Sequence, residues 1–547
     1  MLQERVPIPR SRLLALAVVL SLAAACRQVE APTRSAPPAA PAVDFDAIGA
    51  RLDPYVPKQR VIVLTDIANE PDDQMSLVRF LVYSNQFDVE GLIATTSTWM
   101  RSNVRPDVIH ALLDRYAEVH PTLREHAAGF PDPAALKRLV VAGQTGFGMD
   151  AVGAGKMSAG AELILRAADA NDSRPLWITI WGGANTLAQA LDHARATRDQ
   201  TASSKLLAAL RVYSISDQDD AGPWIRREFP GLHYIAMPST PDGDQYASAT
   251  WTGISGDHFY KNAPGADFTP FTKAWVDANV RAKGPLGKMY PYPCCIHEGD
   301  TPSFLGLIDN GLASAISPAY GGWGGRYVWR RFHGEPRPFW TQGGDAYPGR
   351  DNSRDTVVVD GRSYTSDQAT IWRWRTAFQH DFAARMDWTI KPPRDANHNP
   401  EAIVDLPWLP ASAERRNAGK APVLVEATVG RPIVLDASAS TDPDGDRLSF
   451  TWFYYPEAGT GIPGRPVLDA GQPPIGGGGN QNEGGIPSSP DGPPEPPARA
   501  IVKNGNTAIA TVIPNAAGTA HIILVVEDNG RPSLTSYRRI VLRIKPR

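Results

Sequence analysis

Two hydrophobic patterns alternate between residues 58 and 320. Short apolar runs recur, and each is followed by a stretch with apolar residues at helical spacing. The runs that predict strands are Val61–Leu64, Val89–Ala94, Leu176–Ile180 and Leu210–Ile215. The stretches that predict helices begin at Asp72, at Arg105, at Met157 and after Thr186. This repetition predicts an α/β fold with an open, mostly parallel sheet and helices on both faces.

The pattern changes near residue 418, where short β-like runs alternate with turns up to the C-terminus. Such a pattern predicts a small all-β sandwich, with Trp452 as its buried tryptophan. We therefore expect an α/β domain over 58–390, a linker over 391–417 and the sandwich over 418–547. Residues 456–498 are rich in Gly and Pro and are expected to form a flexible insertion in the sandwich.

The N-terminus has the pattern of an export signal. Three arginines precede the apolar run Leu13–Ala25, which is too short to span a bilayer. The following Cys26 resembles the lipidated cysteine of a bacterial lipobox, with an ordinary signal peptide as the alternative. We expect a signal peptide over 1–26, a disordered tether over 27–57 and an exported protein. Such a protein would be periplasmic or anchored in the outer membrane through its N-terminal lipid only.

Composition narrows the possible functions. The chain has 547 residues, enough for at least two domains, and a net charge of −3, which gives no electrostatic basis for binding nucleic acid. Cys294 and Cys295 are adjacent, and the sequence leaves open whether they form a vicinal disulfide or stay free. No Walker loop, Gly-x-Ser-x-Gly elbow or Cys-x-x-Cys zinc motif is present. A homo-oligomer is left open.

An acidic loop follows the first strand. Asp66, Glu70, Asp72 and Asp73 fall within eight residues, and such crowding is unfavourable unless a cation compensates it. Carboxylate oxygens suit Ca²⁺ or Mg²⁺, and Ca²⁺ tolerates the looser geometry. The alternative is a helix N-terminus that favours acids through its dipole. Asp66 and Glu70 favour the metal, because they precede the first helical turn.

Polar residues also follow the other predicted strands. Trp99, Asn185, Asp217 and Asp219 each come shortly after one of them. The carboxyl ends of parallel strands lie at one edge of a sheet, so these residues are expected to converge there with the acidic loop.

The loop-like region 285–325 supplies further candidates. Asp300 is expected to precede a helix that starts near residue 302, as its cap. His297 and Glu298 stand directly before Gly299 and Asp300 in this region. Trp323, among alternating glycines and aromatics, suits a platform for a sugar ring, although inward packing of these aromatics is the alternative. Residues 366–386 predict a core helix with its arginines on a solvated side.

The segment Val61–Asp73 resembles the signature loop of nucleoside hydrolases, which binds Ca²⁺ and sugar hydroxyls. Five residues separate Asp66 from Asp72 here, where that family usually has three. The longer loop is similar to that of secreted bacterial proteins that combine a nucleoside hydrolase-like domain with a small β domain and are often labelled cellulose-binding. The string Leu435–Asp446 resembles the polycystic-kidney-type immunoglobulin-like repeat. Its Asp442, Asp444 and Asp446 suit either Ca²⁺ or, as the simpler account, an Asp/Gly turn.

The resemblance implies a set of site residues. It places Asp66, Asp73, Asn185 and Asp300 around Ca²⁺, with Asn185 at the position of a carbonyl ligand, and Asp72 on the sugar hydroxyls. The substrate-binding residues that we expect with Asp72 are Asn69, Glu70, Trp99, Asp217, Asp219 and Trp323.

These residues predict a hydrolase that cleaves a glycosidic or N-glycosidic bond with a Ca²⁺-bound water. Asp66 is the candidate base, and a carboxylate beside the ring would stabilise positive charge on the sugar. A glycine, Gly299, precedes Asp300 where some nucleoside hydrolases have a histidine, so His297 or Glu298 is the candidate acid that protonates the leaving group. This departure argues against a nucleobase leaving group, and an exported protein with a β domain suits a carbohydrate better. The alternatives are a protein that binds a cellulose-like glycan without cleaving it, and a structural lipoprotein with a vestigial metal site.

Overall fold

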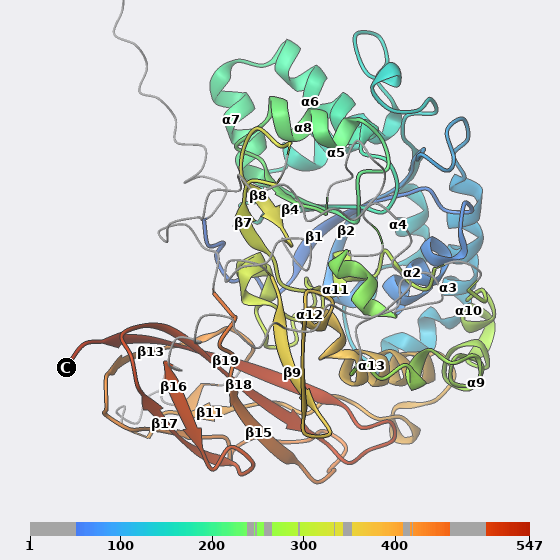
Figure 1. Cartoon of the computed structure of the whole chain (residues 1–547). Helices are drawn as coiled ribbons and strands as arrows, with labels where there is room; N and C mark the ends of the chain where they lie inside the picture. The colour runs from blue at the N-terminus through green and yellow to red at the C-terminus, as the bar shows by residue number, and fades with distance from the viewer. Residues whose placement is uncertain are drawn as a thin grey trace, which may run out of the picture. The chain divides into compact units, whose positions relative to one another are not determined.

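An eight-stranded sheet organises the first part of the chain in the computed structural model (Figure 1). The order is β3-β2-β1-β4-β5-β6-β8-β7, and every pair is parallel except β7 with β8. The strands are β1 (Gln59–Thr65), β2 (Phe87–Ala94), β3 (Val140–Ala142), β4 (Leu176–Ile180), β5 (Leu210–Ser214), β6 (His233–Ile235), β7 (Val328–Arg330) and β8 (Phe339–Thr341).

The structure describes residues 51–237, 246, 249–255, 265–293, 296–332, 334–342, 353–407, 416–417, 419–459 and 499–547. The predicted lipidated Cys26, the pair Cys294 and Cys295 and most of the predicted insertion 456–498 lie outside these residues. In the part of the chain that is described, no helix is both long and apolar enough to cross a membrane.

Helices cover the sheet, with α5, α6 and α8 on one side and α2, α3 and α13 on the other (Figure 1). The helices are α2 (Pro71–Val82), α3 (Pro106–His126), α4 (Pro133–Arg138), α5 (Ala159–Ala168), α6 (Asn185–Thr197), α7 (Gln200–Ala209), α8 (Ala221–Glu228), α9 (Lys273–Val276), α10 (Gly284–Lys288), α11 (Pro302–Leu305), α12 (Ala369–Trp372) and α13 (Arg375–Asp387). Short 3₁₀ helices and one π-helical turn, Asp277–Arg281, complete this part. The fold class predicted from the hydrophobic pattern is confirmed.

The C-terminal part is a β sandwich. One sheet has the order β12-β11-β14-β17-β16 and the other β13-β19-β18-β15, and their inner faces share a core around Trp452. The strands are β11 (Val404–Asp405), β12 (Arg416–Asn417), β13 (Val423–Thr428), β14 (Ile433–Asp436), β15 (Ser449–Tyr454), β16 (Ala500–Lys503), β17 (Ile509–Pro514), β18 (Gly518–Glu527) and β19 (Thr535–Lys545). A separate hairpin of β9 (Asp355–Val359) and β10 (Arg362–Ser366) precedes α12.

Two segments that were expected to be loose are packed. Asp53 and Tyr55, in the predicted tether, hold the chain to the α/β part, because Asp53 pairs with Arg211 and the Tyr55 hydroxyl donates to Asp309 at 2.8 Å. In the predicted linker 391–417, β11 and β12 join a sheet of the sandwich. Short polar stretches show no hydrophobic pattern, so the sequence does not predict which residues they contact.

The predicted helix over 366–386 is interrupted between α12 and α13, and its arginines are not solvated. Arg375 is 1% exposed and donates to the backbone carbonyls of Gly253 and Ile254, while Arg385 pairs with Asp381. The prediction of a solvated arginine side is therefore wrong. Buried carbonyls and carboxylates take the place of water for these guanidinium groups.

Side chains of the sandwich enter the core of the α/β part. Tyr537 contacts Trp323 and Trp374 edge to face, and the backbone N–H of Tyr537 donates to the carbonyl of Asn310. The Tyr455 hydroxyl donates to Asp355 at 2.5 Å. These contacts join the described residues of the α/β part and of the sandwich in one compact unit.

The buried carboxylate of Asp355 is the centre of this contact, since Arg326, Arg373 and Tyr455 all bind it. We expect Asp355→Asn to lower the free energy of unfolding by about 3 kcal/mol, because it removes the buried carboxylate charge that Arg326 and Arg373 share. Urea unfolding measures this loss. The control Asp107→Asn, which breaks an exposed pair with Arg105, should not change stability. Equal stability of the two variants would contradict the role of Asp355.

Candidate functional site

The site lies where the strand order reverses. From β1 the chain continues to β2 and β3 on one side, and β4 then pairs with the other edge of β1 and leads to β5. Open α/β sheets bind ligands at such a switch point, outside the carboxyl ends of the strands. The loops that meet here are the acidic loop after β1 and Trp181–Ala184 after β4. A side-chain carbon on Gly182 would lie 2.8 Å from an oxygen of Asp66, so a glycine is needed for this close approach.

Three carboxylates form the centre of the site. Asp72 and Asp73 occupy the first turn of α2, and Asp300 comes from the loop before α11. All three are buried, and each offers an oxygen within 4.8 Å of the others. The helix dipole accounts for two acids at this helix start, but not for the arrival of a third from a distant loop. The cap of α11 is Thr301, so the predicted capping role of Asp300 is wrong.

The charges of these three carboxylates favour the binding of a cation. Burial, and then the charges of the neighbouring acids, raise the pKa of Asp72, Asp73 and Asp300 well above the usual range. The Thr65 hydroxyl donates to Asp73, whereas Oδ2 of Asp300 is buried without a hydrogen-bond partner. An unpaired buried carboxylate oxygen is unfavourable. A divalent cation that prefers oxygen ligands would fit this set of donors.

Asp66, Asn69 and Glu70 lie beside the three carboxylates. Asp66 is buried, and burial raises its pKa to about 6. Burial, followed by the charge of Asp66, raises the pKa of Glu70 to about 7. The Asn69 amide donates to Asp66 Oδ2 at 3.4 Å and to Glu70. Asp66 is not one of the three acids whose oxygens lie together, so its place as a metal ligand stays a prediction.

Asn185 and Asp219 brace the neighbouring loops. Asp219 accepts hydrogen bonds from the backbone N–H groups of Asn185 and Ala221, both at 3.0 Å, and burial raises its pKa to about 7. The Asn185 amide donates to Thr96 and to the carbonyl of Gly146, while its Oδ1 is buried without a hydrogen-bond partner. The roles predicted for Asn185 toward a metal and for Asp219 toward a substrate stay predictions.

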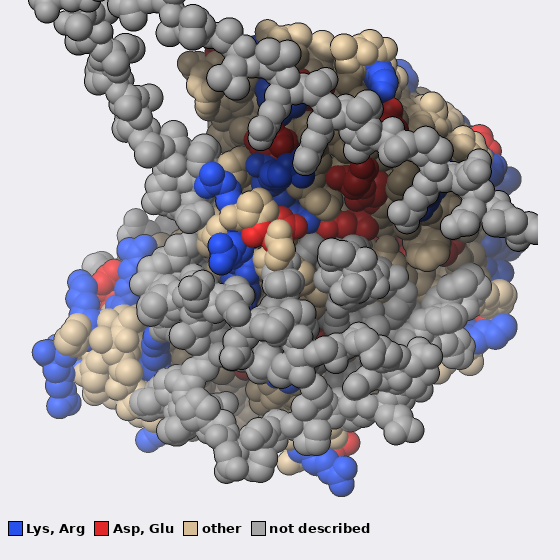
Figure 2. Space-filling model, turned by 45° about the horizontal axis from the view of Figure 1, so that its top comes forward, with Lys and Arg blue, Asp and Glu red and all other residues tan. Residues whose placement is uncertain are grey.

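Acids with a basic partner differ from this group. Asp217 forms a bidentate pair with the buried Arg226, with both distances 2.8 Å. Glu335 also binds that guanidinium, so the pair fixes the loop after β5 and the predicted substrate role of Asp217 is corrected. Figure 2 shows acidic side chains gathered in a recess of the face that it presents, with basic side chains beside them.

The two predicted aromatic contacts have opposite environments. Trp99 is 56% exposed in the loop after β2, where its backbone N–H donates to Ser97, so it is accessible to a ligand. Trp323 is 1% exposed and packs against Phe378 and Tyr537. The prediction that Trp323 is a sugar platform is therefore wrong, and the alternative of inward packing holds. The sandwich covers this tryptophan, which sequence spacing does not reveal.

His297 and Glu298 point into the core instead of into the site. Glu298 is fully buried and pairs with Arg79 at 2.8 Å, and the Tyr290 hydroxyl donates to it at 2.5 Å. The same hydroxyl lies 2.9 Å from Nε2 of His297, so the imidazole is the donor of that bond. Burial lowers the pKa of His297 to about 3. Both side chains are buried and are engaged by Tyr290 and Arg79, so neither is accessible to a leaving group and both assignments are corrected.

Sequence reasoning missed Thr65, which donates to Asp73, and Arg79, the buried cation beside Glu298. Thr65 is the polar residue at the end of an apolar run, which is a usable signal. Arg79 reads as an ordinary solvated residue of an amphipathic helix, and only the tertiary structure shows its partner.

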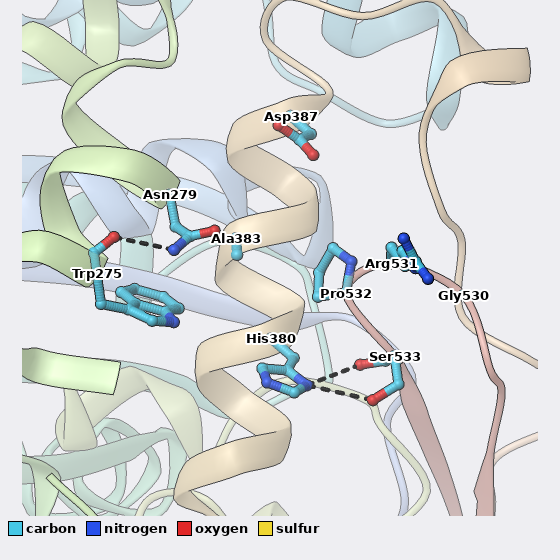
Figure 3. A pocket seen from close by; sticks show the side chains of 9 residues that line it. All are labelled: Trp275, Asn279, His380, Ala383, Asp387, Gly530, Arg531, Pro532 and Ser533. Atoms are coloured by element: carbon cyan, nitrogen blue, oxygen red, sulfur yellow. Dashed lines mark hydrogen bonds between the residues drawn. The ribbon is translucent and has the colours of Figure 1, made fainter. Parts of the chain in front are cut away.

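A cavity of about 460 Å³ lies elsewhere (Figure 3). Trp275, Asn279 and α13 residues line it together with the loop Gly530–Ser533 of the sandwich, and His380 contacts Ser533 there. None of the predicted site residues lines this cavity.

The buried His297 predicts a pH dependence of stability. In the unfolded chain His297 binds a proton below about pH 6.5. In the folded protein the same residue binds it only near pH 3. The contribution of this residue to stability should therefore fall by up to about 1.4 kcal/mol per pH unit as the pH decreases through that range. His297→Gln, whose amide still donates to Tyr290, should flatten the dependence in urea unfolding between pH 7.5 and 4.5. The half-buried control His110→Gln should keep the slope of the wild type, and equal slopes for all three proteins would contradict the assignment.

Two family models match the chain. Residues 60–327 match the nucleoside hydrolase-like domain of the cellulose-binding protein Sde182, and residues 432–544 match the C-terminal domain of the cellulose-binding protein Sde0182. A search of curated proteins found no match.

A solved structure extends the likeness over nearly the whole chain. It is a nucleoside hydrolase-related hypothetical protein from Saccharophagus degradans, described as associated with carbohydrate metabolism. The identity is 33%, the match covers 89% of this chain and 100% of that chain, and the TM-score is 0.67. The PKD domain from KIAA 1837 protein (19% identity, 23% of this chain and 83% of that chain, TM-score 0.13) and the effector protein XOO4466 (10%, 61% and 94%, TM-score 0.27) also match. At these scores neither likeness bears on function.

Proposed function

The chain belongs to the nucleoside hydrolase-like family of cellulose-binding Sde182, and from this premise we propose that it is a Ca²⁺-dependent hydrolase of the cell envelope. Its substrate would be a carbohydrate-derived molecule with a glycosidic or N-glycosidic bond. The observation that carries the proposal is the group of three buried carboxylates at the switch point of the sheet, with an unpartnered oxygen on Asp300.

Asp72, Asp73 and Asp300 would hold the ion. When bound, Ca²⁺ neutralises part of their charge and lowers the pKa of a water that it coordinates. Thr65 fixes Asp73 by a hydrogen bond, and Gly299 lets Asp72 approach the loop of Asp300, since a side-chain carbon on Gly299 would lie 2.9 Å from Asp72. A preformed site of this kind needs little rearrangement to bind the ion.

Asp66 would act as the base. It directly follows β1 beside the three carboxylates, the Asn69 amide donates to it, and Gly182 leaves room for its side chain. A base in this position takes a proton from the attacking water, and a carboxylate close to the ring stabilises the positive charge that develops on the sugar. Glu70 and the exposed Trp99 border the same loops and would contact the substrate.

The second candidate function is binding without cleavage of a cellulose-like glycan. It is favoured by the burial of His297 and Glu298, which removes both candidates for the leaving-group acid, and by the family description. The same loops would then hold the glycan, with Trp99 as an accessible aromatic contact.

We expect Ca²⁺ to raise the unfolding midpoint of the chelator-treated protein, because a ligand that binds the native state stabilises it by mass action. At a Ca²⁺ concentration of 100 times Kd, the gain in the free energy of unfolding is about 2.7 kcal/mol. Asp73→Asn and Asp300→Asn should each reduce the response, whereas the exposed control Asp107→Asn should respond like the wild type. Differential scanning fluorimetry over a Ca²⁺ titration measures this. A full response in both site variants would rule out this metal site.

Hydrolysis and binding are separated by Asp66→Asn. If the protein is a hydrolase, this variant should lose at least 100-fold in kcat on a cleaved substrate while it still binds the substrate, since the amide keeps the shape but accepts no proton. Chromatographic assays of glycosides, cello-oligosaccharides and nucleosides measure cleavage, and calorimetry measures binding. Oligosaccharide binding by the wild type without cleavage of any of these compounds would favour the second function.

A further inference from the structure

Three segments meet at one edge of the sandwich. They are the stretch at Asn397–His398 that follows the α/β part, the turn Asp442–Arg447 before β15, and the loop Asp528–Leu534 between β18 and β19. Backbone N–H groups connect them, since His398 donates to the Asp444 carboxylate at 2.7 Å and Arg447 to the side chain of Asn529 at 2.6 Å. The segments are therefore held close together independently of any ligand.

Two carboxylates in these loops each use only one oxygen. Oδ1 of Asp528 accepts from the backbone N–H groups of Gly530 and Leu534, at 2.8 and 2.9 Å. Oδ1 of Asp442 accepts from the N–H groups of Asp444 and Asp446, at 2.9 and 3.0 Å. The other oxygen of each, Oδ2, is buried and has no hydrogen-bond partner. The backbone thus fixes both carboxylates and leaves one free oxygen on each.

Asn397 supplies a third free oxygen. Its Nδ2 donates to Oδ1 of Asp528 at 3.0 Å and to the carbonyl of Pro532 at 2.8 Å. Both partners are acceptors only, so the amide nitrogen, and not Oδ1, is the atom that binds them. That oxygen is also buried without a hydrogen-bond partner. Asn397 and Asp528 are 6% and 4% exposed, so water does not compensate these atoms freely.

In the described part of the chain the two acids accept hydrogen bonds, but neither Asp442 nor Asp528 forms an ion pair. Burial raises the pKa of Asp528, and the charge of Asp442 adds to this rise. Two carboxylate oxygens and an amide oxygen on irregular loops are the hard, flexible ligand set that Ca²⁺ prefers.

We propose that Asn397 Oδ1, Asp442 Oδ2 and Asp528 Oδ2 bind a second Ca²⁺, separate from the carboxylates of the α/β sheet. Its role is structural, because it ties the segment that leaves the α/β part to two loops of the sandwich. Asp442 takes part through its buried oxygen, whereas Asp444 is engaged by His398. The proposal is independent of whether the protein cleaves or only binds its substrate.

The test counts bound Ca²⁺ by native mass spectrometry and calorimetry on the full chain, with Ca²⁺ alone as the probe. Two equivalents are expected for the wild type and one for Asp528→Asn. Asp442→Asn should also bind one equivalent. Its Oδ1 still accepts the same backbone hydrogen bonds, so the loss of Ca²⁺ would not come from a change in the turn. The control Asp436→Asn changes another aspartate of the sandwich, whose Oδ1 accepts from the N–H of Ser438, and it should keep both equivalents.

Asp73→Asn leaves the loops of the sandwich unchanged. It therefore tests the second site without relying on the folding of the sandwich variants or on the proposed function. One equivalent is expected to remain in it, and the loss of all bound Ca²⁺ would overturn the second site. If only the site in the α/β sheet fails, the wild type binds one equivalent and Asp528→Asn binds none. If Asp442→Asn and Asp528→Asn both bind as much Ca²⁺ as the wild type, the three oxygens hold water only and the proposal is wrong.

Discussion

Mutual repulsion between buried carboxylates is the constraint on which the site depends. Asp72, Asp73 and Asp300 are brought together by a helix start and a distant loop, in a place that water does not reach freely. Only a strong packing framework can hold like charges in this way. The central strands β1 and β4, which are buried along their whole length, provide that framework, and Gly299 leaves out the side chain that would separate Asp72 from the loop of Asp300.

Elsewhere the protein deals with buried charge by pairing it. Arg79 with Glu298, Arg226 with Asp217, and Arg326 with Asp355 each place an arginine against a carboxylate in the interior. These pairs hold loops and domains in place, and they leave no free donor or acceptor for chemistry at their carboxylates. A buried carboxylate with an arginine partner has a structural role, whereas one without such a partner is a candidate ligand. The presence of this partner distinguishes the two better than residue type does.

The sequence predicts much of the framework and part of the site. β4 has the predicted bounds, because a continuous apolar run with polar neighbours has few other interpretations. The acidic loop was noticed because crowded acids after a strand are unusual, and Asp300, which the family resemblance suggested, lies with Asp72 and Asp73. The environments of Trp323, His297 and Arg375 were not predictable, because each depends on a partner from a distant part of the chain, and local spacing carries no information about that partner.

The entry of Tyr537 into the core of the α/β part has a consequence for biosynthesis. Tyr537 is the partner of Trp323, which precedes it by 214 residues. A ribosome therefore completes the whole α/β sheet long before the residue that covers Trp323 is made, so the nascent chain exposes an apolar surface while the sandwich is still being translated. Exposed surfaces of this kind favour aggregation. The α/β part is therefore most prone to aggregation in the interval before β19 packs against it.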